Sequence, residues 1–263
     1  MPVEVGEMLA VIEQDEFGRV AYEVMERAFA VHNRLGRLFD EHVYQDALQH
    51  ELGARATAEV RIEVAHGDFR KTYFVDLIVD GAGLFELKTV ERLTNAHRAQ
   101  LLNYLLLTGS RHGKLINFRP ARVEHEFVNT SLTHNDRTAF TVMDDQWCDS
   151  AANSNDLKNL IIDLLRDWGT ALSIQLYEEA ITHHFGGQEA LHRSIEITDR
   201  GRMLGTHTVP LIAPRTTFKI SSLHRNLGEY ETHLRRLLQH TTLQQIHWIN
   251  IDLKRVTLNT LSK

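Results

Sequence analysis

The chain has 263 residues and a mass of 30.2 kDa; 43% of its residues are hydrophobic and 24% are charged. This composition suits one large globular domain or two small ones, and it excludes a chain that is disordered throughout. The single cysteine, Cys148, excludes a disulfide framework and a cysteine-based zinc site within the chain. Neither an export signal nor a membrane span is predicted, so we expect a protein of the reducing cytoplasm with no membrane partner.

Charge is distributed unevenly along the chain. The formal net charge is -6, yet residues 201–263 hold nine Lys and Arg against three Asp and Glu. A basic end beside an acidic remainder favours local binding of phosphate groups over general coating of nucleic acid. A solvated surface with no partner is the alternative interpretation.

Apolar spacing and turn residues predict the following elements in chain order. They are helices over 18–35 and 40–52, strands over 59–64 and 73–79, a hairpin turn at 80–83, a strand over 84–90, a helix over 95–108, and strands over 114–118 and 123–128. These elements predict one α/β unit within residues 1–135. Polar residues 136–150 are predicted to be a linker, after which similar elements recur over 151–263.

The second half resembles the first at a nearly constant separation. Tyr44-Gln-Asp-Ala-Leu-Gln-His50 recurs as Tyr177-Glu-Glu-Ala-Ile-Thr-His183, and Ile116-Asn-Phe118 recurs at the same separation as Ile249-Asn-Ile251. We therefore predict an α/β protein that contains two copies of one unit, each a small mixed sheet flanked by helices. Two unrelated α/β domains with a similar order of elements are the alternative.

Two acids and a lysine fall on adjacent predicted strands of the first unit. Glu86 and Lys88 alternate along one strand, so they share a face, and the hairpin can bring Asp76 beside them. Paired carboxylates make an oxygen site suited to Mg²⁺ or Mn²⁺. Such an ion activates water and neutralises charge on a scissile phosphate, while a lysine orients the water or stabilises the transition state. The alternative is an ion pair on a solvated hairpin.

These residues resemble the active-site motif of the PD-(D/E)XK nuclease superfamily. More narrowly, residues 25–130 resemble the GxxExxY proteins, although the glycine that names the motif falls on Leu38. The resemblance rests on the following segments: Val31-His-Asn-Arg-Leu-Gly36, Glu41-x-x-Tyr44, Phe85-Glu-Leu-Lys88, His97-x-Ala-Gln100, Asn103-Tyr-Leu105, Thr108-Gly109 and Leu115-Ile-Asn-Phe118.

The resemblance implies a role for each residue of the motif. Asp76 and Glu86 would be the main metal ligands, and Glu41 would be a helical acid that supports the metal. Lys88 would be the catalytic lysine, and Gln100 would reach the site from its helix. His97, on the same helical face as Gln100, is interpreted as a packing or backbone-bonding residue.

The second copy lacks this set of residues. Glu41 corresponds to Ile174, Asp76 to Pro210, Glu86 to Lys219, Lys88 to Ser221 and Gln100 to Arg236. The second copy is therefore predicted to be a pseudonuclease. Lys219, Arg235 and Arg236 lie in its basic segment and could hold nucleic acid; the copy could equally serve as a built-in dimer partner that stabilises the first.

The sequence thus predicts a nuclease that hydrolyses phosphodiester bonds with Mg²⁺ or Mn²⁺. We expect DNA as the substrate, one active site per chain, and a homodimer or a protein partner as an open alternative. A non-enzymatic nucleic-acid-binding or assembly subunit of a repair or defence complex is the first rival function. A metal-dependent hydrolase of another phosphate ester is the second.

Overall fold

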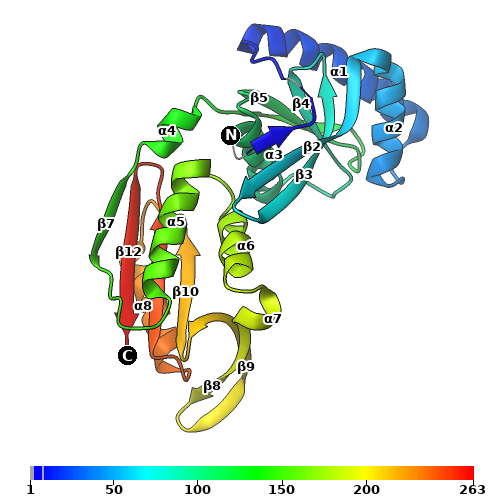
Figure 1. The fold of residues 1–263 in the computed structure, drawn as a ribbon. Coiled ribbons are helices and arrows are strands. Elements are labelled where there is room, and N and C mark those ends of the chain that lie inside the picture. The colour runs from blue at the N-terminus through cyan, green and yellow to red at the C-terminus, as the bar shows by residue number, and fades with distance from the viewer. Residues whose placement is uncertain (1–2, 8) are drawn as a thin grey trace. The chain divides into compact units, whose positions relative to one another are not determined.

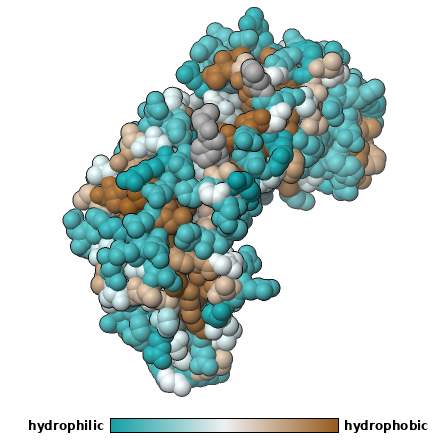
Figure 2. Space-filling model, in the orientation of Figure 1, coloured by the Kyte–Doolittle hydropathy of each residue, from teal (hydrophilic) through white to brown (hydrophobic). Residues whose placement is uncertain are grey.

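The computed structural model describes residues 3–7 and 9–263. The chain divides into two units: unit 1 ends at His134, and unit 2 begins at Asn135. Each is an α/β unit with a six-stranded mixed sheet and flanking helices (Figure 1). The fold class predicted from the sequence is therefore confirmed. Hydrophilic residues cover most of the face drawn in Figure 2, with separate apolar patches in each unit.

Unit 1 contains the elements expected from its sequence, with one additional short strand. In chain order they are β1 (Val3–Val5), α1 (Gln14–Leu35), α2 (Glu41–Leu52), the 3-10 helix η1 (Gly53–Arg55), β2 (Ala56–His66), β3 (Phe69–Val79), β4 (Gly83–Lys88), α3 (Asn95–Thr108), β5 (His112–Asn117) and β6 (Glu124–Asn129). Their sheet order is β1-β2-β3-β4-β5-β6. The pair β4–β5 is parallel, because α3 carries the chain back between them, and the other neighbours are antiparallel.

The core of unit 1 lies between the first two helices and one face of the sheet. Phe17 and Val24 of α1 pack with Tyr44 of α2 and with Phe85 and Phe118 of the sheet. On α3, Leu101 packs so closely on Gly113 of β5 that a Cβ there would lie 3.1 Å from the leucine side chain. Helices therefore hold β4 in the interior, and all six of its residues are buried.

Unit 2 repeats this order of elements around its own sheet. After α4 (His134–Thr138) come β7 (Thr141–Gln146), α5 (Ser154–Trp168), α6 (Ile174–His184), α7 (Gln188–Leu191), β8 (His192–Asp199), β9 (Arg202–Ala213), β10 (Thr216–Ser221), α8 (Leu227–Gln239), β11 (Gln245–Ile251) and β12 (Arg255–Ser262). The sheet order is β7-β12-β11-β10-β9-β8, and β10–β11 is the parallel pair that corresponds to β4–β5. Figure 1 shows α5 in front of this sheet and α8 behind it.

The prediction that residues 136–150 form a linker does not hold for residues 141–146. They form β7, which pairs in parallel with β12 through Val142 and Val256. Directly after it, the ring of Trp147 stacks on His247 at 4.3 Å between centroids. An edge strand exposes every second side chain, so its composition can be as polar as that of a linker.

A tyrosine makes the same hydrogen bond in both units. The hydroxyl of Tyr44 donates to the carbonyl of Gly36 at 2.9 Å, and that of Tyr177 donates to the carbonyl of Gly169. The two donors and the two acceptors have the same separation along the chain. The repeated sequence therefore carries a repeated contact.

An asparagine at the end of the parallel pair provides a second such match. The side chain of Asn117 accepts from the backbone N–H of Val90 and donates to its carbonyl, at 3.0 and 2.8 Å. Asn250 makes both bonds with Leu223, at 2.9 and 3.0 Å, and both residues follow their counterparts at the separation found for the tyrosines. The topology and these bonds agree on the correspondence between the units.

In the described part of the chain, no helix is long and apolar enough to cross a membrane.

Candidate active site

The central strand β4 carries two buried charged residues on one face. Glu86 and Lys88 alternate with Leu87, so their side chains leave the same side of the strand. The exposed fraction is 1% for Glu86 and 8% for Lys88. On the neighbouring strand β3, Asp76 accepts a hydrogen bond from the N–H of Leu87 at 2.7 Å. The β3–β4 hairpin thus brings the three charged groups predicted from the sequence to one place.

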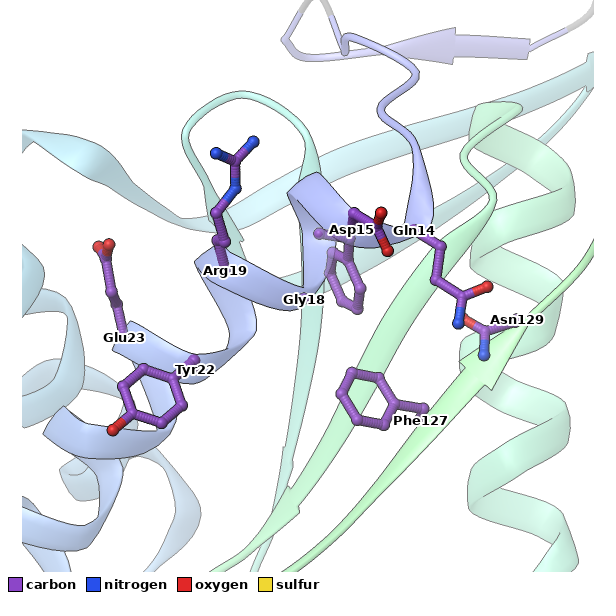
Figure 3. A pocket seen from close by; sticks show the side chains of 9 residues that line it. Gln14, Asp15, Gly18, Arg19, Tyr22, Glu23, Phe127 and Asn129 are labelled. Carbon is purple, nitrogen blue, oxygen red and sulfur yellow. The ribbon is translucent and has the colours of Figure 1, made fainter.

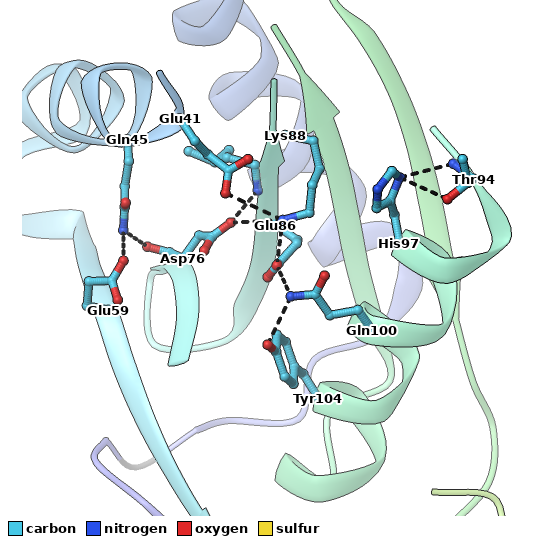
Figure 4. A network of polar contacts seen from close by, with 11 residues as sticks. Glu41, Gln45, Glu59, Asp76, Glu86, Lys88, Thr94, His97, Gln100 and Tyr104 are labelled. Carbon is cyan, nitrogen blue, oxygen red and sulfur yellow. Dashed lines mark hydrogen bonds and ion pairs between the residues drawn. The ribbon is translucent and has the colours of Figure 1, made fainter. Parts of the chain in front are cut away.

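Lys88 lies at the centre of three carboxylates, as Figure 4 shows. Its Nζ is 2.9 Å from Glu86 Oε1, 3.6 Å from Glu41 Oε1 and 3.9 Å from Asp76 Oδ2. Glu41 is the first residue of α2, so this acid comes from a helix and the others come from strands. Three carboxyl groups and one ammonium group converge around the buried side chains of Glu86 and Lys88, an arrangement that is costly unless the groups are used.

Helix α3 adds an amide to the cluster. The Nε2 of Gln100 donates to Glu86 Oε1 at 2.6 Å and lies 3.0 Å from the hydroxyl of Tyr104, one turn further along. His97 has a different role, because its Nδ1 accepts from the backbone N–H of Thr94 at 3.0 Å and caps the helix. The structure therefore places Gln100 at the cluster and His97 in the backbone-bonding role interpreted from the sequence.

Burial changes the acid–base properties of these carboxyls. It raises the pKa of Glu86 to about 8, and the neighbouring negative charge of Asp76 adds to this increase. Burial likewise raises the pKa of Asp76 to about 6, against the opposing effects of Lys88 and the Leu87 N–H. Burial alone would lower the pKa of Lys88, but attraction to Glu86 and the other acids outweighs it, and the pKa is raised. Burial thus favours the protonated form of Glu86, while the surrounding acids favour the charged form of Lys88.

Two residues of the site were missed by reasoning from the sequence. The buried side chain of Gln45 donates from Nε2 to the carbonyl of Asp76 and to Glu59 Oε1, both at 2.8 Å. Glu59 on β2 has a φ of 53°, a left-handed conformation that is rare for a residue with a side chain. Gln45 follows Glu41 by one helical turn, and that spacing could have revealed it. No sequence pattern marks Glu59.

The residues fit a divalent cation by their chemistry. Among the described residues, no three or more His, Cys, Asp or Glu side chains form a group able to hold a metal ion as they stand. However, Glu86 Oε2 is buried and has no hydrogen-bond partner, so it is an acceptor that a cation would satisfy. The cluster offers carboxylate oxygens, which are the ligands that Mg²⁺ and Mn²⁺ prefer.

A hydroxyl and an indole replace the charged cluster in unit 2. Ser221, which occupies the position of Lys88, donates to Asn250 Oδ1 at 2.7 Å and accepts from Trp248 Nε1 at 2.8 Å. Ile174 and Pro210 stand at the positions of Glu41 and Asp76. Nonpolar residues, a hydrogen-bonded hydroxyl and the half-buried Lys219, at the position of Glu86, therefore occupy this part of unit 2.

The structure corrects the predicted counterpart of Gln100. At the end of α3, Thr108 Oγ1 donates to the carbonyl of Tyr104 at 2.8 Å. In unit 2, Thr241 Oγ1 donates to the carbonyl of Leu237 at 2.6 Å, so the constant separation between the units is kept here too. Gln100 therefore corresponds to His233 and not to Arg236. The misalignment arose because residues three apart lie on one helical face, so both alignments match apolar with apolar positions.

The three basic residues predicted to bind nucleic acid do not form one cluster. Lys219 is half-buried on β10; burial raises the pKa of the nearby Glu178, and the charge of Lys219 opposes that rise. Arg235 on α8 pairs with Glu231 at 2.7 Å. Arg236, the next residue of the helix, is exposed. Of the three, Arg236 is best placed to meet a phosphate from solution.

A surface cavity of about 940 Å³ in unit 1 contains none of the predicted site residues (Figure 3). Phe17 and Tyr22 of α1 and Phe127 and Asn129 of β6 are among its lining residues. The ring of Phe127 also covers the buried ammonium of Lys114, 3.5 Å from its centroid. This cavity is separate from the carboxylate cluster.

Comparison with known proteins gave one match to a family model, and the matched residues lie in unit 1. Comparison with curated proteins gave no match. A solved structure described as the crystal structure of SSO0001 is 22% identical to this chain, with a TM-score of 0.30. The match covers 44% of this chain and 64% of the SSO0001 chain, which is less than two thirds of that protein. Residues 18–129, which carry all five predicted catalytic residues, match the model of the PD-(D/E)XK nuclease superfamily.

Proposed function

We propose that the chain is a metal-dependent nuclease of the GxxExxY type that hydrolyses phosphodiester bonds in DNA at one site in unit 1. The observation that carries the proposal is the convergence of Glu41, Asp76, Glu86 and Gln100 around Lys88. These five residues lie in the segment that matches the nuclease superfamily, whose members generally hydrolyse phosphodiester bonds. Buried carboxylates with raised pKa values are typical of functional sites.

In this proposal Asp76, Glu86 and Glu41 hold Mg²⁺ or Mn²⁺. When bound, the ion would lower the pKa of a water molecule and neutralise charge on the phosphate. The chain's own groups prepare the site: the N–H of Leu87 orients the carboxylate of Asp76, and Gln100 orients that of Glu86. Lys88 supplies a buried positive charge that can orient the attacking water or stabilise negative charge in the transition state. Deprotonation of Glu86 accompanies cation binding, because a ligand carboxylate must be ionised.

Unit 2 is proposed to be a duplicated copy without catalysis. Its topology and its hydrogen bonds at Tyr177 and Asn250 match those of unit 1, while Ser221 takes the place of Lys88. Scaffold contacts are thus kept where catalytic groups are not. Its exposed basic residues suit a role in holding substrate.

The test is cleavage of labelled single-stranded, duplex and branched DNA and of RNA, with Mg²⁺, Mn²⁺ or EDTA. Wild type is compared with Asp76→Asn and Lys88→Ala, and with Asp46→Asn as the matched control on the exposed face of α2. We expect metal-dependent products that fall by about 100-fold or more in both site variants, since each loses transition-state stabilisation. The control should cleave as wild type does.

No cleavage of any substrate by the wild type, with DNA binding that survives both site substitutions, would overturn the nuclease proposal. That result would favour a non-enzymatic nucleic-acid-binding or assembly subunit. Cleavage of small phosphate esters without any effect on nucleic acid would point to the other rival hydrolase.

A further inference from the structure

The hairpin of β8 and β9 extends from unit 2 as a two-stranded ribbon, drawn in yellow in Figure 1. From Thr198 to Thr208 its residues are exposed, apart from Asp199 and Gly205, which are partly exposed. Close to the turn, the backbone N–H of Thr198 donates to the carbonyl of His240 at 2.8 Å, and Ile197 forms a β-bridge with Thr241. The turn and the outer half of β9 therefore present both faces to solvent, while the outer end of β8 is attached to the residues that follow α8.

The turn of this ribbon is basic. Arg200 and Gly201 form the two-residue loop between the paired residues Asp199 and Arg202, and both have positive φ values, 49° and 77°. Glycine and asparagine usually occupy such a turn, so an arginine adopts it at a conformational cost. No acidic residue occurs between Arg200 and Asn226 in the sequence. The apex thus presents two guanidinium groups beside one acid, Asp199, which lies 3.6 Å from His240 Nδ1.

Two large apolar side chains follow the turn and are exposed to solvent. Met203 is 54% exposed and Leu204 is 61% exposed. Ile197 pairs with Gly205 and Thr198 pairs with Met203, so Leu204 is the extra residue of a β-bulge and has no partner across the ribbon. A bulge bends a strand and redirects side chains. Apolar residues at this place are costly in water unless a partner covers them.

The corresponding ribbon of unit 1 shows that the topology does not require this exposure. There the first residue after the turn, Phe69, is buried. Strand β1 pairs with the outer part of β2, with Val3 beside Val64 and Val5 beside Ile62. In unit 2 the extra edge strand, β7, pairs with β12 at the other side of the sheet. The outer half of β9 is therefore left uncovered in unit 2, whereas β8 forms a bridge to Thr241 through Ile197.

We propose that the β8–β9 ribbon of unit 2 inserts into the major groove of duplex DNA; the inference rests on the proposed nuclease function. A groove about 12 Å wide admits a two-stranded ribbon, whose strands lie about 5 Å apart. Arginine recognises the guanine edge there, and apolar side chains contact the thymine methyl group. Arg200 and Arg202 supply the first chemistry, and Met203 and Leu204 supply the second. Arg236, one turn before the end of α8, is exposed and suits a backbone phosphate.

The test measures binding of labelled duplex DNA by fluorescence anisotropy, in EDTA so that no cleavage occurs. Two double variants are made, Arg200→Ala with Arg202→Ala, and Met203→Ser with Leu204→Ser. Arg70→Ala, an exposed residue beside the turn of the unit 1 ribbon, is the matched control. We expect each double variant to weaken duplex binding by about 10-fold or more, and the control to bind as wild type does.

The salt dependence of binding and competition by groove-binding ligands test which part of the duplex the ribbon contacts. Arg236→Ala should reduce the slope of log affinity against log salt by about one, because it removes a phosphate contact, while the Met203 and Leu204 pair should leave the slope unchanged. Methyl green, a major-groove ligand, should compete with the protein, and netropsin, a minor-groove ligand, should not. Double-stranded RNA should bind weakly, because its major groove is deep and narrow.

Duplex binding that is unchanged in both double variants would overturn the inference, as would competition by netropsin alone. A wild-type dimer that the Met203 and Leu204 variant disperses, with DNA binding intact, would assign the ribbon to contact with a second copy instead. Cleavage of single-stranded DNA by the same variants separates the two proposals. If the wild type cleaves and the ribbon variants bind normally, the inference alone fails; if the ribbon binds duplex DNA and nothing is cleaved, the nuclease function alone fails.

Discussion

A single buried carboxyl sets the acid–base behaviour of the candidate site. Glu86 receives hydrogen bonds from Lys88 and Gln100 on one oxygen, while its other oxygen is buried without a partner. Burial and the nearby charge of Asp76 therefore outweigh the attraction of Lys88, and the pKa of Glu86 rises to about 8. An ionised Glu86 is a costly state in the absence of a cation.

The stability of the metal-free protein should therefore fall as the pH rises to about 8. The pKa of Glu86 is raised from 4.5 in the unfolded chain, so the folded state binds more protons between these values, and unfolding becomes easier with each step upward in pH. We expect the wild type to lose on the order of a few kcal/mol of its free energy of unfolding over this range. Glu86→Gln cannot ionise at this position, so it should not show this loss. Thermal unfolding in EDTA across this range measures it. If the stability of wild type and of Glu86→Gln changed in the same way with pH, Glu86 would not be the group responsible. Glu16→Gln, on the surface of α1, is the control.

Gln45 should stabilise the site through the backbone of β3. Its removal in Gln45→Ala leaves the carbonyl of Asp76 without the side-chain hydrogen bond it now accepts, and a buried group left without a partner costs about 1–3 kcal/mol. We expect a lower midpoint of denaturant unfolding together with weaker metal-dependent cleavage. Gln49→Ala, one turn further along α2, is the matched control. A variant of Gln45 as stable and active as wild type would remove the residue from the site.

At the scale of elements, much of the fold could be predicted because the hydrophobic periods and turn residues of unit 1 agree with one another. The hairpin turn at Asp80 and Gly81 placed Asp76 beside Glu86, and the structure has this pairing. Short edge strands escaped prediction, because three residues in β1 and a polar β7 are too short or too exposed to show a period. Glu59 escaped because its left-handed backbone depends on tertiary contacts rather than on the residue type.

The paired asparagines at the ends of the parallel strands test whether the elements of the two units are equivalent. Asn117→Ala and Asn250→Ala each remove two hydrogen bonds to the backbone. We expect each to lower the free energy of unfolding by about 2 kcal/mol. All three tryptophans, Trp147, Trp168 and Trp248, lie in unit 2, so Asn250→Ala should shift the tryptophan-fluorescence transition. If one of the two variants kept the free energy of unfolding of the wild type, the two asparagines would not have equivalent roles.

At the scale of the whole molecule, the two units share a fold but differ at the place of the candidate site. Unit 1 has the buried charged cluster, and unit 2 has Ser221, Trp248 and Asn250 joined by hydrogen bonds at the corresponding place. The sequence could predict this difference, because loss of charge at several matched positions is visible without coordinates. It could not predict the exposed ribbon, since Met203 and Leu204 read equally well as core residues of a strand.

The proposed function, with one catalytic cluster per chain, makes a prediction about the products of cleavage. A single site cuts one strand in each binding event, so a supercoiled plasmid should first give nicked circles, and linear DNA should follow only after further events. Gel analysis of a time course measures the two products. An excess of the Asp76→Asn variant mixed with wild type should compete for DNA. It should not change the order in which nicked circles and linear DNA form. Linear DNA that accompanies nicked circles from the start, and that disappears when the variant is added, would instead show that two chains cut together, each supplying the cluster around Lys88.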